Sequence, residues 1–156
     1  RYTNKDVISM KYFLLLLILV LSACTATPEV TSKSSSTDVM RLIEKTAVNA
    51  PKGVKGTFQF SIQASGIERK VVYLNTELDY RDRRNITVAL HPKTIVAFTK
   101  KYGSSPEAYF INKNIEVTGE AKQIKIWFGF NGKRSQKYYF QTHIRVKSIS
   151  QIKVLN

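Results

Sequence analysis

The chain has 156 residues, 43% of them hydrophobic, and a formal net charge of +14 from 25 Lys and Arg against 11 Asp and Glu. This length suits one domain with a modest core, and a single cysteine excludes a disulfide within a monomer. One cysteine and two histidines are too few soft ligands for a structural zinc site, so we expect no metal and no cofactor.

The first recognisable segment is an apolar stretch over residues 12–21, which follows Met10-Lys11 and ends in Leu21-Ser22-Ala23-Cys24. A basic start, an apolar stretch and small residues before a break are typical of a secretory signal peptide, here residues 1–23. A membrane-spanning helix needs about 20 apolar residues, so this stretch is too short to be one. A buried helix would not explain the cysteine after small residues.

The tetrapeptide that ends in Cys24 resembles the lipobox of bacterial lipoproteins. The resemblance implies that the peptide is cut before Cys24 and that Cys24 is lipidated, which makes the membrane a partner. Inner-membrane lipoproteins of Gram-negative bacteria carry Asp at the next position, where this chain has Thr25. We therefore expect a cell-envelope protein on the outer membrane, facing the periplasm. We also expect Met10 to be the true start and residues 1–9 not to be native.

Beyond Cys24 the composition changes twice. Residues 24–37 are rich in Ser and Thr and are predicted to be a flexible tether. Residues 38–48 then place apolar side chains at helical spacing, with Thr37 or Asp38 as N-cap. We expect a short helix that packs its stripe on the domain formed by residues 38–156; the stripe is Val39, Leu42, Ile43 and Ala47.

Period-two alternation predicts half-buried strands over residues 57–64, 71–75 and 86–90, with Ser65-Gly66 as a break after the first. Residues 92–102 change to helical spacing, with Pro92 in the first turn and Gly103 just past the end. Two long strands follow, over residues 115–128 and 138–146. The apolar parity changes between Val117 and Ile124, which predicts a bulge near Gly119.

The register of the last hairpin is predicted by matching apolar faces, which pairs Ile126 with Tyr138 and Ile124 with Phe140. That register makes the loop odd in length, with residues 131–133 at its tip. It also sets Lys125 opposite Tyr139 and Trp127 opposite Lys137 on the outward face. The core is expected to contain Phe58, Phe60, Val88, Leu90, Phe98, Val117, Ile126, Phe140 and Ile144.

Five strands with one helix between the third and fourth is the order of the OB-fold, a mainly β Greek-key barrel. Four short segments also resemble a bacterial OB-fold family related to tRNA-anticodon-binding domains: Val72-Tyr73-Leu74-Asn75, Asn85-Ile86-Thr87-Val88, residues 114–119 and residues 150–154. The resemblance covers residues 38–156 and implies a five-stranded barrel that follows the short N-terminal helix.

The chemistry-bearing residues form no catalytic motif. The chain has no Gly-rich phosphate loop, no His-Glu-x-x-His helix and no nucleophile elbow, so an enzyme is not expected. His91 precedes Pro92, which indicates a capping or turn role, and His143 is expected to be a solvated or hydrogen-bonded residue of the last strand. Asp79 and Asp82 lie among arginines, which favours local ion pairs over acid–base work.

Residues 51–156 hold 19 Lys and Arg against 7 Asp and Glu, a net +12 that favours nucleic acid, lipid headgroups or acidic polysaccharide. OB-folds bind on the face of strands two and three. The residues that the resemblance places there are Arg69, Lys70, Tyr73, Arg81, Arg83, Arg84, Trp127, Lys133, Arg134, Lys137 and Tyr139.

Two classes of function stay open. The first is a monomeric, lipid-anchored module of the cell envelope that binds an anionic ligand or an envelope protein. The second is a single-stranded nucleic-acid-binding protein, because aromatic residues alternate with basic ones around the same face. Solubility is the other explanation of the charge, and covering the barrel surface is the other explanation of Trp127.

Overall fold

The computed structural model describes residues 36–130 and 132–155. The predicted signal peptide and Cys24, the predicted site of lipidation, lie outside the described residues, as does most of the predicted tether. The tether is shorter than predicted at its C-terminal end, since the first described helix begins at Ser36. Thr37 is therefore inside that helix and is not its N-cap.

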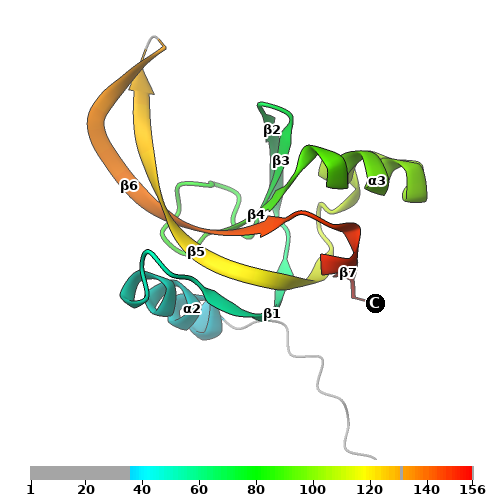
Figure 1. Cartoon of the computed structure of the whole chain (residues 1–156), viewed down its shortest axis with the longest axis horizontal. Helices are drawn as coiled ribbons and strands as arrows, with labels where there is room; N and C mark the ends of the chain where they lie inside the picture. Colours follow the sequence, from blue (N-terminus) through cyan, green and yellow to red (C-terminus); the bar gives the residue numbers. More distant parts are fainter. Residues whose placement is uncertain (1–35, 131, 156) are drawn as a thin grey trace, which may run out of the picture. The chain divides into compact units, whose positions relative to one another are not determined.

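The described chain is mainly β, with one helix before the strands of a single sheet and the other helices between them (Figure 1). The elements are α2 (Ser36–Val48), β1 (Val54–Ser61), β2 (Ala64–Glu68), β3 (Val71–Asn75), β4 (Ile86–Leu90), α3 (Pro92–Tyr102), α4 (Pro106–Tyr109), β5 (Asn114–Phe130), β6 (Lys133–Val146), the 3-10 helix η1 (Ile149–Gln151) and β7 (Ile152–Val154).

β1 and β2 act as one long strand that changes its partner between Ile62 and Gln63. The N–H of Ile62 donates to the carbonyl of Lys113 (3.0 Å), beside β5, whereas the N–H of Gln63 donates to the carbonyl of Asn75 (2.9 Å), in β3. Accordingly β1 pairs antiparallel with β5, and β2 pairs antiparallel with β3. One strand thus contributes to two sides of the sheet.

The remaining pairs close the sheet on itself. β3 and β4 are antiparallel, β4 and β6 are parallel, and β6 and β5 are antiparallel. If β1 and β2 count as the first strand, the neighbours around the sheet are first, β3, β4, β6, β5 and first again. This order is consistent with an OB-like fold. Both α3 and α4 lie between its third and fourth strands in the chain, where a single helix was predicted.

The strand count differs from the predicted five. The sheet has seven assigned strands, because the long first strand is divided into β1 and β2 and because β7 pairs with β5. Ser65-Gly66 lies inside β2 and does not end the first strand. The short helix α4 falls in a segment that was expected to be a plain connector.

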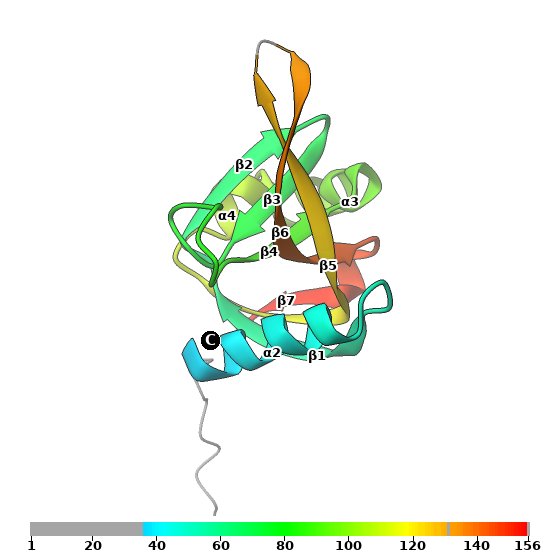
Figure 2. The same cartoon turned by 90° about the vertical axis from the view of Figure 1, so that its left-hand side faces the viewer.

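The core is one cluster inside the barrel, and most of its predicted members are buried. Phe60, Val88, Leu90, Phe98, Val117 and Ile144 are confirmed. Phe58 and Ile126 are half-buried, and Phe140 is 49% exposed, so its predicted burial is wrong. The reason is that β5 and β6 continue past the barrel as a long projecting hairpin (Figure 2), which carries Phe140 away from the core.

The predicted register of this hairpin is also wrong. Ile126 pairs with Tyr139, Lys125 with Phe140, and Trp127 with Tyr138. The prediction assumed that the apolar residues of both strands face one core, but beyond the barrel neither side of the hairpin faces a core.

The predicted length of the loop that joins β5 and β6 is wrong as well. Phe130 pairs with Lys133, so residues 131–132 join the strands, and the loop is not odd in length. The register shifts between Trp127 and Gly129, because residues 135–137 of β6 lie opposite Phe128 alone. This irregularity stands in place of the bulge that was predicted near Gly119.

Gly119 itself continues a regular ladder, opposite Gly56 of β1. Ile115, Val117 and Ala121 therefore all stay on the core face of β5. A Cβ at Gly119 would meet the Ile144 side chain at 3.0 Å and would push it by a few tenths of an ångström, so the glycine here suits close packing and does not mark a bend.

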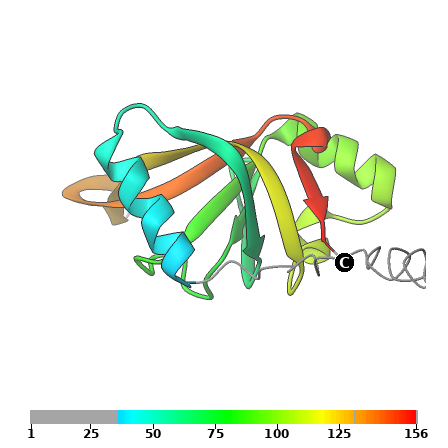
Figure 3. The ribbon, with the colours of Figure 1, turned by 90° about the horizontal axis from the view of Figure 1, so that it is seen from below.

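The two longer helices cover the barrel from outside. α2 packs against β1 and β5 through buried Leu42 and the partly buried Val39 and Ile43 (Figure 3). Thr46, and not Ala47, is its last buried residue.

α3 has the ends that the sequence predicts. His91 Nδ1 accepts from the N–H of Lys93 (3.3 Å), which confirms the capping role of His91. Pro92 lies in the first turn, and Gly103 ends the helix at φ 69°.

Candidate ligand-binding groove

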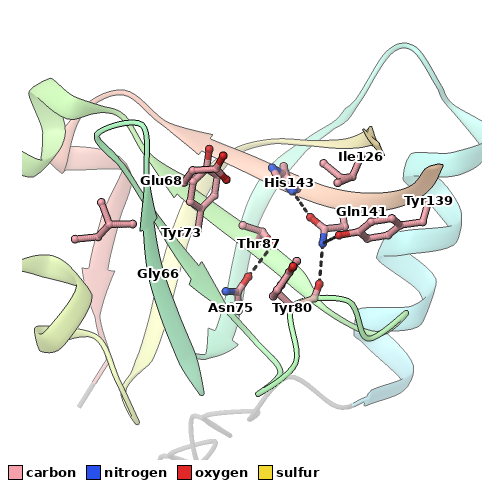
Figure 4. Close-up of a pocket in the computed structure, with 11 residues that line it drawn as sticks. Gly66, Glu68, Tyr73, Asn75, Tyr80, Thr87, Ile126, Tyr139, Gln141 and His143 are labelled. Atoms are coloured by element: carbon pink, nitrogen blue, oxygen red, sulfur yellow. Dashed lines mark hydrogen bonds between the residues drawn. The ribbon is translucent and has the colours of Figure 1, made fainter. Parts of the chain in front are cut away.

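A groove of about 420 Å³ lies between the β2–β3 hairpin and the projecting β5–β6 hairpin (Figure 4). Its floor is the outer surface of β3, β4 and β6, which is the face that OB-folds use for binding. The lining residues are Gly66, Ile67, Glu68, Tyr73, Asn75, Tyr80, Thr87, Ile126, Tyr139, Gln141 and His143.

Alternate residues of β6 bring Tyr139, Gln141 and His143 to this surface, since a strand turns successive side chains to opposite faces. Gln141 Nε2 donates to the carbonyl of Tyr80 (2.7 Å) and to Tyr139 Oη (3.2 Å). These two bonds orient the amide, so that its Oε1 is the atom that meets His143 Nε2 at 2.8 Å. Figure 4 shows this chain of contacts along one wall of the groove.

The contact with Gln141 fixes the tautomer of His143. An amide oxygen can only accept, so the proton is on Nε2 and Nδ1 keeps its lone pair. Burial, and to a lesser extent the positive charge of nearby Arg145, lowers the pKa of His143 to about 4. His143 is therefore neutral at physiological pH, hydrogen-bonded as predicted, and its ring meets Tyr73 edge-on with centroids 6.2 Å apart.

Tyr80 reaches the groove from the long loop between β3 and β4, which is held by buried Asn85. Asn85 Oδ1 accepts from the N–H groups of Thr76 (3.0 Å) and Glu77 (3.2 Å). Its Nδ2 donates to Asn75 Oδ1 (3.1 Å), to the carbonyl of Tyr80 (3.2 Å) and to Thr87 Oγ1 (3.0 Å). The carbonyl of Tyr80 is thus held from both sides, by Asn85 and by Gln141.

Of the two aspartates predicted to form local ion pairs, Asp82 does so, whereas Asp79 makes a local hydrogen bond to the backbone. The guanidinium of Arg84 donates to both carboxylate oxygens of Asp82 (3.1 and 2.8 Å), which lowers the pKa of Asp82 to about 2. Asp79 Oδ1 accepts from the N–H of Arg81 (2.9 Å). Arg84 is thereby committed to Asp82, whereas Arg81 lies over the Tyr80 ring, 5.0 Å from its centroid.

The structure brings together only some of the predicted binding residues. Tyr73 and Tyr139 line the groove, and Arg81 lies at its edge against Tyr80. Arg81 and Arg83 also line an adjoining cavity of about 470 Å³ that shares Tyr139 with the groove. This side of the molecule therefore joins the tyrosines to two arginines.

The other predicted residues lie elsewhere. Arg69 and Lys70 form the exposed turn after Glu68, both with positive φ, and Lys133 and Lys137 are exposed on the hairpin. Trp127 is on the opposite side of the hairpin from Tyr139, since it pairs with Tyr138, and Arg134 lies over its ring at 3.6 Å. Lys125 therefore faces Phe140 and not Tyr139.

The groove is less basic than the sequence suggested. Among the described residues that line it, Glu68 is the one charged side chain. Sequence reasoning missed Asn75, Thr87 and Gln141, which the alternation of β3, β4 and β6 could have placed on the same face as Tyr73 and Tyr139. Their neutral amides and hydroxyl suit a polar ring, while charge is confined to the rim.

Among the described residues, 36–130 and 132–155, no three His, Cys, Asp or Glu side chains gather as metal ligands. No helix in that part of the chain is both long and apolar enough to span a membrane.

No family model matches the chain, and no curated protein sequence matches it. One similar solved structure is an aspartyl-tRNA synthetase from Entamoeba histolytica, 19% identical, with a TM-score of 0.41 over 74% of this chain and 20% of that one. Another is a putative aspartyl-tRNA synthetase from Leishmania major Friedlin, 11% identical, with a TM-score of 0.37 over 92% of this chain and 26% of that one.

The chain thus spans about a fifth to a quarter of the length of these two proteins. Likeness at this level carries no argument about binding. The OB-like fold is assigned from the strand pairing of the chain itself.

Proposed function

We propose that the protein is an exported, lipid-anchored OB-fold module that binds an anionic ligand with a flat ring in this groove. The supporting observation is that Tyr73, Tyr80 and Tyr139 line one groove around the neutral pair Gln141 and His143, with Arg81 at the edge. The export and the anchor rest on the sequence that ends in Cys24.

The distribution of charge decides how such a ligand lies. An anionic group is costly to bury without a cation. The one charged side chain in the described lining of the groove is Glu68, which is itself anionic. The ring therefore enters among the tyrosines, and the anionic group stays at the rim beside Arg81 and Arg83. His143 Nδ1 is left as an acceptor for a donor on the ring.

Single-stranded nucleic acid is the second candidate, favoured by the same three tyrosines. A base stacked on an aromatic side chain contributes about 1–3 kcal/mol, with little dependence on sequence. Phosphates at the arginine rim would make the affinity fall steeply with salt. Acidic polysaccharide presents the same pairing of ring and anion. For a protein partner, by contrast, the affinity need not fall steeply with salt.

The test uses the full chain in detergent and measures binding of a labelled oligothymidylate and of a labelled acidic oligosaccharide at two salt concentrations. Tyr139→Ala should weaken binding of the preferred ligand by about 1–3 kcal/mol. Tyr138→Ala is the matched control, because the adjacent tyrosine lies on the other side of the same strand. It should leave the affinity unchanged.

The outcome separates the candidates. Binding of the oligothymidylate with a steep loss in salt selects nucleic acid, and binding of the oligosaccharide alone selects an acidic sugar. If neither ligand binds, or if Tyr138→Ala and Tyr139→Ala weaken binding equally, the groove is not the binding site.

The anchor is tested separately with Cys24→Ala. Several acyl chains hold a protein firmly on a membrane, so the wild type should fractionate with membranes. The variant should remain uncleaved or become soluble. A variant that matures and fractionates like the wild type contradicts the lipoprotein assignment.

A further inference from the structure

The β5–β6 hairpin has a second side, opposite the groove, that no step above uses. Cross-strand pairs Lys125–Phe140 and Trp127–Tyr138 share it, and Arg134 joins it by contact with the Trp127 ring. These five residues are called the outer aromatic face. Tyr138 and Phe140 are 47% and 49% exposed there, which is unusual for large rings side by side.

The outer aromatic face begins where the cover of α2 ends. Thr46 of α2 meets Thr142 of β6, with 3.2 Å between their Oγ1 atoms, and Thr142 is buried. Ile43 and Phe140 line one cavity at the boundary. Beyond Phe140, towards the tip, Tyr138 stays exposed and Trp127 is half-buried beneath Arg134, so a partner can reach this side of the described hairpin.

Cations lie against these rings. Lys125 Nζ is 4.4 Å from the ring centroid of Tyr138, 5.4 Å from that of Trp127 and 5.8 Å from that of Phe140. The guanidinium carbon of Arg134 is 3.6 Å from the centroid of Trp127. The outer aromatic face therefore combines apolar rings with positive charge. Among the described residues, no acidic side chain contacts Lys125 or Arg134.

The part of the hairpin in which β5 and β6 pair with each other carries charge of one sign. Residues 121–146 contain six Lys and Arg and no Asp or Glu. A partner must therefore supply negative charge and, for the exposed rings, an apolar environment. An anionic bilayer surface supplies both, and Trp, Tyr, Lys and Arg are the side chains that favour the level of the lipid headgroups.

We propose that the outer aromatic face docks on a bilayer surface that contains anionic lipid. The rings of Trp127, Tyr138 and Phe140 enter the boundary between headgroups and acyl chains, and Lys125 and Arg134 contact the phosphates. Nucleic acid fits less well, because Arg134 and Lys125 already occupy ring faces on which a base would stack.

This docking is separate from the groove and from lipid on Cys24. Tyr138 and Tyr139 are neighbours on β6 but belong to opposite sides of the hairpin, and no residue that lines the groove belongs to the outer aromatic face. The two surfaces meet at the adjoining cavity, where Phe140 lies with Arg81, Arg83 and Tyr139.

Trp127 is the only tryptophan of the chain, so its fluorescence reports on this face alone. The full chain is reconstituted in vesicles of phosphatidylcholine, or of phosphatidylcholine with about a third phosphatidylglycerol, with and without lipid brominated near the headgroup. We expect a blue shift and quenching by the brominated lipid in the anionic vesicles, and much less of either in the neutral ones.

The double variant Lys125→Glu with Arg134→Glu should abolish the quenching of Trp127. If the N-terminal segment anchors the protein, the variant should still float with the vesicles. Lys100→Glu with Lys101→Glu is the matched control. It makes the same charge change at two exposed positions of α3 and should leave the quenching in place.

Three outcomes overturn the inference: Trp127 remains open to aqueous iodide in anionic vesicles, the control pair abolishes quenching as fully as the test pair, or single-stranded DNA quenches Trp127 while vesicles do not. The last would make the face a nucleic-acid surface. Tyr139→Ala, which tests the groove, should leave the vesicle signal unchanged, so failure of one proposal is distinguishable from failure of the other.

Discussion

Replacing Asn85 with alanine tests whether its side chain organises the loop that brings Tyr80 to the groove. Asn85 is 2% exposed and makes five hydrogen bonds of 3.2 Å or less, two accepted from backbone N–H groups and three donated. The three acceptors are Asn75 Oδ1, the carbonyl of Tyr80 and Thr87 Oγ1.

The loss in free energy of unfolding caused by Asn85→Ala is limited, because most of the hydrogen-bond partners of Asn85 keep a second hydrogen bond. The N–H of Thr76 also meets the carbonyl of Ile86 (3.2 Å), and Gln141 still donates to the carbonyl of Tyr80. Five bonds at the low end of about 0.5 kcal/mol each, with about 1 kcal/mol for the stranded N–H of Glu77, give a loss of about 3–4 kcal/mol.

Urea unfolding followed by circular dichroism measures this loss. Asn49→Ala is the control, because Asn49 is exposed and its side chain makes one bond, to the carbonyl of Lys45 (2.8 Å). It should cost less than about 1 kcal/mol. Asn85→Ala should also weaken binding in the groove, because the carbonyl of Tyr80 loses one of the two hydrogen bonds that hold it. A loss no larger than that of Asn49→Ala would refute the reasoning.

Two further predictions follow from burial. Phe60→Ala should cost about 3–5 kcal/mol in the same urea assay, whereas Phe140→Ala should cost less than about 1 kcal/mol, because Phe60 is 4% exposed and Phe140 is 49% exposed; equal costs would contradict the placement of the hairpin. The pKa of His143 is lowered to about 4, so the unfolded chain binds a proton that the folded chain rejects between pH 6.5 and 4, and stability should fall by up to roughly 3 kcal/mol as the pH falls through that window. His143→Gln should flatten this dependence, and an unchanged pH profile of the urea midpoint would count against the partly buried, neutral imidazole.

Local signals account for the parts of the fold that the sequence predicted well. The ends of α3 are marked by Pro92 and Gly103, whose backbone preferences act within one turn of the helix. Alternation in β6 placed Gln141 and His143 together on the polar face, because a strand has a fixed period of two. These features need no knowledge of the rest of the chain.

The hairpin was mispredicted because its register depends on where the barrel ends. Matching Ile126 with Tyr138 is reasonable only if one side of the hairpin faces a core, and the core stops at Thr142 and Ile144. Further out, the pairing of Lys125 with Phe140 joins a cation to a ring, which a rule of apolar against apolar rejects. The tip also needed the irregularity opposite Phe128, which no residue pattern marks.

The same one-residue difference decides which side chains can share a ligand. In the predicted register Trp127 lies across from Lys137, and a groove with Trp127, Arg134 and Tyr139 was expected. In the observed register Trp127 and Tyr139 lie on opposite sides of the hairpin. The positive charge of the hairpin is therefore not concentrated in the groove, whose described lining carries only Glu68 as a charged group.

This division explains how a domain with a net +12 can have a nearly neutral groove. A strand longer than the barrel has two free sides, and successive residues such as Tyr138 and Tyr139 serve them independently. A substitution on one side can then change charge or aromatic area without repacking the other. The proposals for the groove and for the outer aromatic face accordingly predict opposite responses to Tyr138→Ala and Tyr139→Ala, two changes of the same chemistry at adjacent positions.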